Sequence, residues 1–202
     1  MKDKIVFATG NEGKMREVRA ILADLGLEIL SMKEAGASLD IVEDGTTFAE
    51  NALIKARAVH EATGALVLAD DSGLEVDYMG GEPGVYSARW MGEDTPYTIK
   101  NQAILDRLAG VPDPERGARF RCVIAAVFPD GSEAVTEGVI EGIIGHESLG
   151  EGGFGYDPIF FLPERGMSTA QLSPEEKNAV SHRGRALEAM KPLIQKWKGE
   201  HQ

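Results

Sequence analysis

The stretch that most constrains the fold is a short apolar run that stops at acidic residues. Residues 65–69 are all small or apolar, and Asp70, Asp71, Ser72 and Gly73 follow them. The run is short enough for a buried strand, and open α/β sheets bind ligands where their strands end. Successive residues of an extended chain point to opposite sides, so we expect different roles for the two acids: one could hold a hard cation or activate a water while the other fixes the turn. The alternative is a plain Asp-Ser-Gly turn, which all three residue types favour.

The N-terminal segment has the pattern strand, glycine turn, helix. Residues 4–8 predict a strand, residues 9–14 a turn, and apolar residues at helical spacing continue from Met15 to Leu25. This geometry directs backbone N–H groups and the positive end of a helix toward an anion, and Lys14 adds a charge. It is not a Walker A loop, because the spacing is shorter and Met15 stands where a magnesium-binding Ser or Thr would be. The competing interpretation is an N-capped helix with a surface lysine.

A second helix is predicted over residues 48–63, because Thr47 and Glu50 have the spacing of a capping box. Glu43 precedes this helix and could supply a second carboxylate to a metal ion near the acidic strand end. Lys55 lies beside the polar edge of the apolar stripe, where a solvated lysine is the default expectation.

The second half of the chain predicts an antiparallel lobe. Residues 119–128 are the longest strand candidate, residues 129–131 a turn, and residues 133–139 its hairpin partner. A glycine-rich stretch follows at residues 150–158. Glycines permit close ligand approach, and Phe154 between them offers a stacking surface for a base. A plain glycine-rich turn is the competing view.

Two further helices are predicted after Ser173 and Ser181, each of which has the residue type of an N-cap. Lys177 lies in the first of these helices, and His182 and Arg183 begin the second. Cations at a helix start oppose the macrodipole, so the last two suggest a bound acceptor or anion. A pair of solvated side chains is the alternative.

The composition limits the classes of partner. The chain has 202 residues and a net charge of −12, which argues against broad nucleic-acid binding. A small polyanion would need a local cationic cluster, for which Lys14, Lys55, Lys177 and Arg183 are available. Cys122 is the chain's one cysteine; it lies in an apolar alternation, which favours a buried core thiol and a reducing compartment. No apolar run approaches the roughly 20 residues that span a bilayer, so we expect a cytoplasmic protein.

Five motifs then carry a resemblance to a known family. In chain order they are Thr9-Gly10-Asn11-x-x-Lys14, Thr47-Phe48-x-Glu50-Asn51-Ala52, Ala69-Asp70-Asp71-Ser72-Gly73-Leu74, Gly152-Gly153-Phe154-Gly155-Tyr156-Asp157-Pro158 and Ser181-His182-Arg183. In this combination the chain resembles the inosine triphosphate pyrophosphatase family, over nearly its whole length.

The resemblance implies an α/β fold: an elongated mixed β-sheet flanked by helices, in two lobes with an active-site cleft between them. It implies one domain over residues 1–202, acting as a homodimer. It also implies Mg²⁺-dependent hydrolysis of ITP, dITP and XTP to the nucleoside monophosphate and pyrophosphate. That activity would keep deaminated purines out of DNA and RNA.

The resemblance also implies roles for particular residues. Asp71 would activate water, and Glu43 and Asp71 would bind Mg²⁺. Phe154 would stack on the base, with Asp157, His182 and Arg183 around its edge. The phosphates would be held by Thr9, Gly10, Asn11, Glu12, Gly13 and Lys14, helped by Lys55 and Lys177, and the remaining substrate-binding residues would be Ser72, Gly155 and Tyr156.

Two alternatives remain open at this point. A related pyrophosphatase could act on modified pyrimidine triphosphates, and a nucleotide-binding regulator could bind without turnover. The acids Glu43, Asp70 and Asp71 weigh against a regulator, because an anion sensor gains nothing from carboxylates beside phosphates. A carboxylate bound to Mg²⁺ is a poor base, so Asp71 could be a ligand, a base or each in turn, and Asp70 could share one role.

Overall fold

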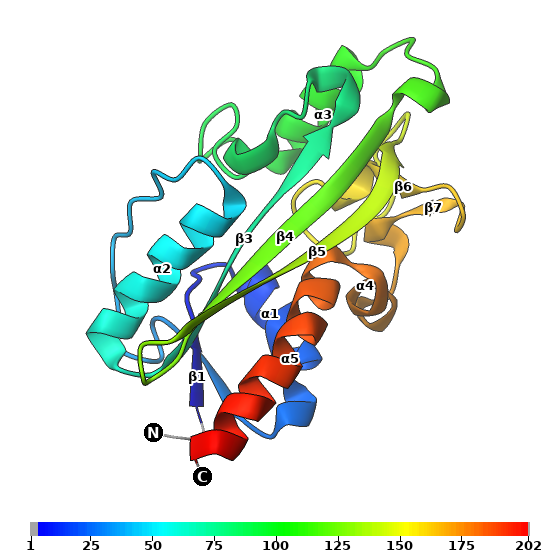
Figure 1. The fold of residues 1–202 in the computed structure, drawn as a ribbon. Helices are drawn as coiled ribbons and strands as arrows, with labels where there is room; N and C mark the ends of the chain where they lie inside the picture. The colour runs from blue at the N-terminus through cyan, green and yellow to red at the C-terminus, as the bar shows by residue number, and fades with distance from the viewer. Residues whose placement is uncertain (1–3, 202) are drawn as a thin grey trace. The chain divides into compact units, whose positions relative to one another are not determined.

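The computed structural model describes residues 4–201, which form a seven-stranded sheet in the order β2-β1-β3-β4-β5-β6-β7 (Figure 1). The sheet is mixed, because β1 is parallel to β2 and β3, whereas β6 is antiparallel to β5 and β7. The strands are β1 Lys4–Phe7, β2 Glu28–Ser31, β3 Leu66–Val76, β4 Gly117–Val127, β5 Glu133–Ile144, β6 Phe160–Leu162 and β7 Met167–Ser168. The helices of the described residues are α1 Glu12–Ile21, α2 Phe48–Thr63, α3 Tyr97–Arg107, α4 Pro174–Val180 and α5 His182–His201. The predicted α/β fold with a mixed sheet is confirmed.

The chain divides into two compact units, each with its own core. Unit 1 contains the described residues up to Asp71, with 122–138 and 182–201. Within it α1 and α5 lie side by side (Figure 1), and Met15, Val18 and Leu187 pack with apolar residues of β1, β3 and β4. Cys122 is fully buried in this core, as predicted.

Unit 2 contains residues 72–121 and 139–181. Its core joins the end of β3 to α3 and to β6 through residues such as Leu74, Ile104 and Phe160, all fully buried. The predictions of one domain over 1–202 and of a cleft between two lobes stay predictions; residues 1–3 and 202 lie outside the described residues.

The predicted end of the acidic strand was wrong. We expected a turn at Asp70 and Asp71, but β3 continues without interruption from Leu66 to Val76. Leu74 and Val76 are fully buried, and β3 is hydrogen-bonded to a neighbour on each side in the sheet. Burial and sheet pairing therefore outweigh the local turn preference of Asp, Ser and Gly. The two acids lie in the middle of a strand.

Several local predictions are confirmed. Helix α2 has the predicted bounds, and the capping box of Thr47 and Glu50 is formed. Helix α4 begins at Pro174 after a capping box from Ser173. Helix α1 is shorter than predicted, because a 3₁₀ turn over Ala23–Leu25 replaces its last turn.

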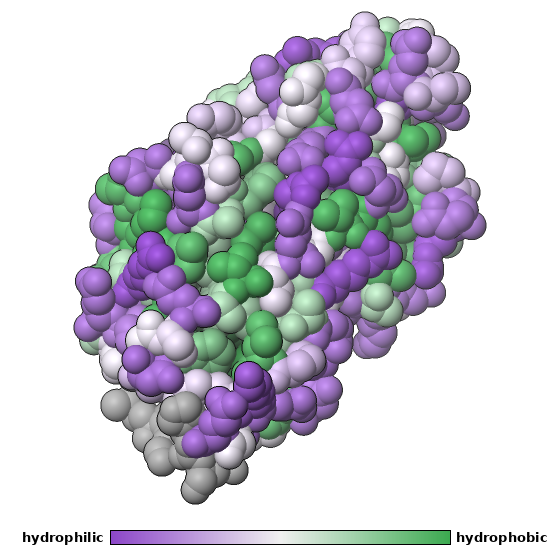
Figure 2. All heavy atoms as spheres, in the orientation of Figure 1, coloured by the Kyte–Doolittle hydropathy of each residue, from purple (hydrophilic) through white to green (hydrophobic). Residues whose placement is uncertain are grey.

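No helix among residues 4–201 is long and apolar enough to cross a membrane. On the face drawn in Figure 2, hydrophilic residues surround smaller hydrophobic patches.

Candidate active site

In unit 1, the end of β1 leads directly into the start of α1. The Asn11 side chain caps the helix by accepting a hydrogen bond from Lys14 N at 3.1 Å. Thr9 Oγ1 accepts one from Asn11 N at 3.1 Å, which fixes the approach to the helix. Gly10 is exposed, and a Cβ there would meet no atom within 4 Å. The first N–H groups of a helix have no partner within the helix, so this turn has the geometry of an anion site. Glu12 and Gly13 form the first turn of α1.

Asp70 is the centre of a buried ion-pair cluster in unit 1. Lys14 Nζ lies 3.0 Å from Asp70 Oδ2, and Arg183 Nη2 lies 3.0 Å from the same oxygen. Arg183 also pairs with Glu17 on α1. Burial alone would raise the pKa of Asp70, but the charges of Lys14 and Arg183 hold it well below its usual range. Asp70 therefore stays ionised and orients two cations, rather than exchanging protons.

Asp71 has a different environment. Asn51 Nδ2 donates to Asp71 Oδ2 at 3.3 Å, and Lys55 Nζ lies 3.6 Å from Oδ1. Burial raises the pKa of Asp71 to about 6, although Lys55 opposes that shift. A carboxylate that titrates near neutral pH is suited to take a proton from water. The pKa values of the two adjacent acids thus shift in opposite directions, and the different roles expected for them stay a prediction.

Lys55 joins Glu43 to Asp71. Its Nζ lies 3.0 Å from Glu43 Oε2, and its side chain is 12% exposed. Burial alone would lower the pKa of Lys55. The negative charges of Asp70, Asp71 and Glu43 raise it by more, so the net shift is upward. The default expectation of a solvated lysine was wrong, because this edge of α2 faces the acids of β3 rather than solvent.

Glu43 and Asp71 also fit a magnesium site. Mg²⁺ is commonly held by one or two carboxylates together with waters and substrate phosphates. Both carboxylates reach one ammonium group, so they converge on one region. Within the described part of the chain, no group of three or more His, Cys, Asp or Glu could hold a metal ion. The chain's donors therefore suit an ion that also binds substrate oxygens.

Asn51 lies at the site although no role was predicted for it from the sequence. It is almost fully buried on α2, and besides contacting Asp71 it accepts a hydrogen bond from Gly45 N at 2.8 Å. A Cβ at Gly45 would approach Asn51 Oδ1 to 2.6 Å. Asn51 thereby orients Asp71 relative to the loop that carries Glu43. The sequence did contain a signal for this role, since Asn51 is a polar residue on the buried face of the predicted helix over residues 48–63.

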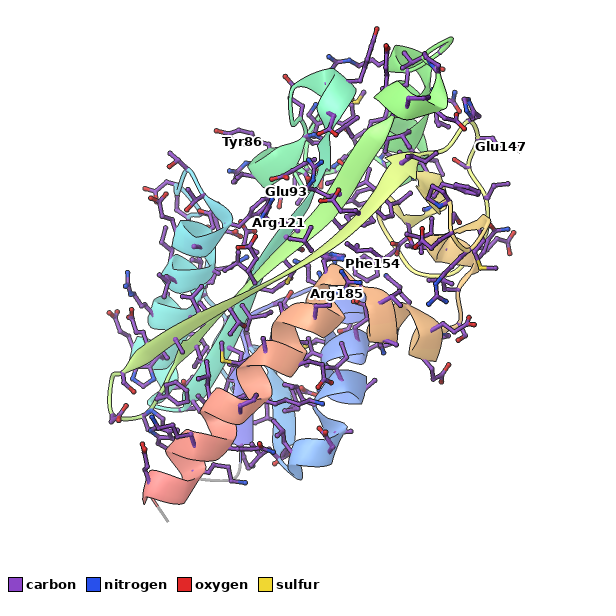
Figure 3. The ribbon with its side chains drawn as sticks, turned by 45° about the vertical axis from the view of Figure 1, so that its right-hand side comes forward. Tyr86, Glu93, Arg121, Glu147, Phe154 and Arg185 are labelled. Carbon is purple, nitrogen blue, oxygen red and sulfur yellow. The ribbon has the colours of Figure 1, made fainter. Side chains whose placement is uncertain are left out.

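In unit 2, Asp157 organises the glycine-rich loop. Its Oδ2 accepts hydrogen bonds from Phe154 N at 2.9 Å and Lys177 Nζ at 2.6 Å, and its Oδ1 accepts one from Thr169 at 2.8 Å. Lys177 Nζ also lies 4.6 Å from the centroid of the Phe154 ring. Gly153 has a φ of +66°, and a Cβ there would lie 2.2 Å from Asp157 Oδ2. The loop thus holds the half-buried Phe154 ring, labelled in Figure 3, with a cation against one face.

The remaining predicted site residues are placed as follows. Tyr156 is buried, and its hydroxyl donates to Ser87 O at 2.6 Å. Ser72 is half-buried on β3 directly after Asp71. His182 and Arg183 are buried at the start of α5, which packs so closely on β5 that a Cβ at Gly138 would lie 2.1 Å from His182 O. Contacts of these residues with a substrate stay predictions.

Comparison with known proteins decides the family. The model of the Ham1 family matches residues 5–193. This chain belongs to the Ham1 family. Two curated relatives, from Desulforamulus reducens and Escherichia coli O157:H7, are each named dITP/XTP pyrophosphatase. The first is 49% identical over 95% of this chain, and the second is 48% identical over 93% of this chain; in both cases the match covers 95% of the relative.

Solved Ham1 proteins have the same fold. The Ham1 protein of Staphylococcus aureus superposes with a TM-score of 0.83 at 39% identity, covering 98% of this chain and 99% of its own. A HAM1 protein of Coxiella burnetii superposes with a TM-score of 0.85 at 40% identity, covering 96% of this chain and 98% of its own. The resemblance drawn from the five motifs is therefore confirmed.

Proposed function

We propose that this Ham1 protein is a nucleoside triphosphate pyrophosphatase that hydrolyses ITP, dITP and XTP to the nucleoside monophosphate and pyrophosphate. The observation that carries the proposal is the pair Asp70 and Asp71. One is locked between cations, and the other has its pKa raised to about 6 beside Lys55 and Glu43. The curated relatives named dITP/XTP pyrophosphatase support the substrate class. Removal of deaminated purine nucleotides from the precursor pool follows from that activity.

The phosphates bind to the start of α1 and to Lys14. Backbone N–H groups of this turn donate to phosphate oxygens, and the ammonium of Lys14 supplies positive charge. Lys55 provides a second cation. Phosphoryl transfer depends on positioning and on neutralising charge, which these groups provide. Lys177 is the weaker phosphate candidate, because Asp157 and the Phe154 ring already hold its ammonium.

Glu43 and Asp71 would hold Mg²⁺, which would neutralise charge on the phosphates. Asp71 takes the two roles in turn, because a carboxylate bound to the metal is a poor base: released from the ion, it accepts the proton of the attacking water, and its pKa of about 6 leaves it ionised at neutral pH. Asn51 and Lys55 hold its two oxygens in place. The hydrolysis breaks the bond between the α and β phosphates, and the water oxygen is retained by one of the two products.

The base stacks on Phe154, whose other face is covered by Lys177. Hypoxanthine and xanthine present an acceptor oxygen at the purine six position, where adenine presents a donor. Donors aimed at that oxygen are left unpaired by adenine, which can cause rejection by several orders of magnitude. The motif resemblance supports His182 and Arg183 as the candidates for these donors; Arg183 is the weaker one, because Asp70 and Glu17 already hold its guanidinium.

We further propose that the protein is a cytoplasmic homodimer. The motif resemblance supports the dimer. The buried thiol of Cys122 fits a reducing compartment.

The test is pyrophosphate release from ITP, XTP, dITP, GTP and ATP with Mg²⁺, run beside Asp71→Asn. We expect fast release from the first three nucleotides and its loss in the variant. Nucleotide binding without release would favour a regulator, and release from modified pyrimidine triphosphates instead would favour the related pyrophosphatase.

A further inference from the structure

Helix α3 contacts the glycine-rich loop of unit 2, residues 150–158, through a buried side-chain amide. Asn101 is 4% exposed, and its Nδ2 donates to Gly155 O at 3.1 Å. Gly155 directly follows Phe154, the ring proposed to stack on the base. The hydrogen bond therefore restrains the Gly155–Tyr156 peptide, one residue beyond that ring.

Tyr97 supports the same loop from one helical turn earlier. Residues four apart lie on one face of a helix, so Tyr97 and Asn101 face the loop together. The Tyr97 ring lies 3.7 Å from where a Cβ of Gly155 would be, and it packs edge-on against Tyr156 with centroids 5.1 Å apart. Gly155 has a φ of +66°, a conformation that a larger residue rarely adopts. Contacts with Tyr97 and Asn101 thus restrain the loop just after Phe154.

The amide of Asn101 is incompletely satisfied. Its nitrogen must face the carbonyl of Gly155, because two oxygens would repel one another. Its Oδ1 is consequently buried with no hydrogen-bond partner among the described residues. A buried acceptor left unpaired lowers stability, so a residue selected only for stability would be apolar here. The side chain is explained by the loop that it holds.

We propose that Asn101 is a positioning residue for purine binding: it fixes the Gly155–Tyr156 peptide, one residue after Phe154, and so holds the loop in the conformation in which the ring stacks on the base. This inference rests on the proposed function, and it assigns to α3 a part in substrate recognition. Asn101 touches the loop and not the reacting atoms, so its substitution is expected to affect binding more than turnover.

The experiment compares Asn101→Leu with the wild-type protein. We expect KM for ITP to rise roughly 3- to 10-fold, the factor that one ordinary hydrogen bond represents, with kcat changed less than about twofold. The melting temperature should be unchanged or higher, because the buried Oδ1 without a partner is removed and Gly155 is only half-buried. Asn101→Asp, which places an oxygen against that carbonyl, should raise KM further.

Gln102→Leu is the matched control. Gln102 is the next residue of α3, it is exposed, and its amide donates to Asp106 Oδ1 at 2.8 Å. It should leave KM unchanged. Binding of inorganic tripolyphosphate, which has no base, should be the same in Asn101→Leu and wild type, whereas binding of IMP should weaken.

Hydrogen exchange of residues 152–158 in the free protein gives a readout that does not depend on the proposed function. Faster exchange in Asn101→Leu, but not in Gln102→Leu, supports the positioning role. Unchanged exchange together with an unchanged KM overturns it, as does a lower melting temperature with unchanged exchange. If wild-type protein hydrolyses no ITP, the proposed function fails, and the exchange data still test whether Asn101 holds the loop.

Discussion

Arg183 Nη2 lies 3.0 Å from Asp70 Oδ2, and both side chains are 1% exposed. The two residues are 113 positions apart in the chain, so the pair ties the start of α5 to β3. A buried charge that loses its partner is left without solvation. The pair therefore determines both the stability of unit 1 and the position of Arg183.

Asp70→Asn is expected to destabilise the protein by about 3–5 kcal/mol, because Arg183 and Lys14 would lose their shared counter-charge. Urea denaturation measures this change. Glu28→Gln is the control, since Glu28 pairs with Lys4 in an exposed ion pair, and such pairs contribute about 0–1 kcal/mol. Equal effects of the two variants would contradict a special role for the buried pair.

Asp71→Asn is expected to abolish activity and, in magnesium-free buffer at pH 8, to stabilise the fold. The folded-state pKa of Asp71 is raised from 3.8 to about 6. The folded state thus binds the proton more tightly than the unfolded state, and the free energy of unfolding falls as pH rises from about 4 to 6. The loss is at most about 3 kcal/mol. Denaturation at pH 4 and pH 8 should show that the variant is more stable than the wild-type protein only at pH 8. A stability gain that does not depend on pH would show that the raised pKa of Asp71 is not its cause.

Lys55→Met is expected to tighten Mn²⁺ binding in the absence of nucleotide, by roughly tenfold. The Lys55 ammonium contacts both Glu43 and Asp71, and a divalent ion binding there must compete with that charge. Electron paramagnetic resonance of free Mn²⁺ measures the affinity. Lys191→Met removes the same charge from a lysine that also contacts two carboxylates, Asp24 and Glu188, and it should leave Mn²⁺ affinity unchanged. Weaker Mn²⁺ binding in Lys55→Met would contradict competition.

Phe154→Ala is expected to lower kcat/KM for ITP by roughly 5- to 150-fold, since stacking of a base on an aromatic ring contributes about 1–3 kcal/mol. Steady-state kinetics measures the loss. Phe154→Tyr keeps the ring and should retain most of the activity. A similar loss in both variants would mean that the ring does not stack on the base.

Features encoded by neighbouring residues were predictable. Helix α2 begins and ends where predicted, because its capping box and the C-terminal Gly64 are local signals. The motif resemblance was also sufficient to name the family, which the Ham1 match confirmed. Each capping signal and each single motif lies within a few consecutive residues, although the family resemblance needed all five motifs together.

The environment of each acid was decided by the tertiary structure. Asp70 and Asp71 are adjacent and identical in type, yet their pKa values shift in opposite directions because Asp70 meets Lys14 and Arg183, and Asp71 is buried with weaker compensation. The continuation of β3 through a turn-favouring stretch and the burial of Lys55 have the same origin. The hydrogen bond from Asn101 to the carbonyl of Gly155, 54 residues away, was also decided by the tertiary structure. Electrostatic and packing energies depend on distances in space, so residues far apart in the chain set them, whereas capping and turn preferences act between neighbours and can be read from the sequence.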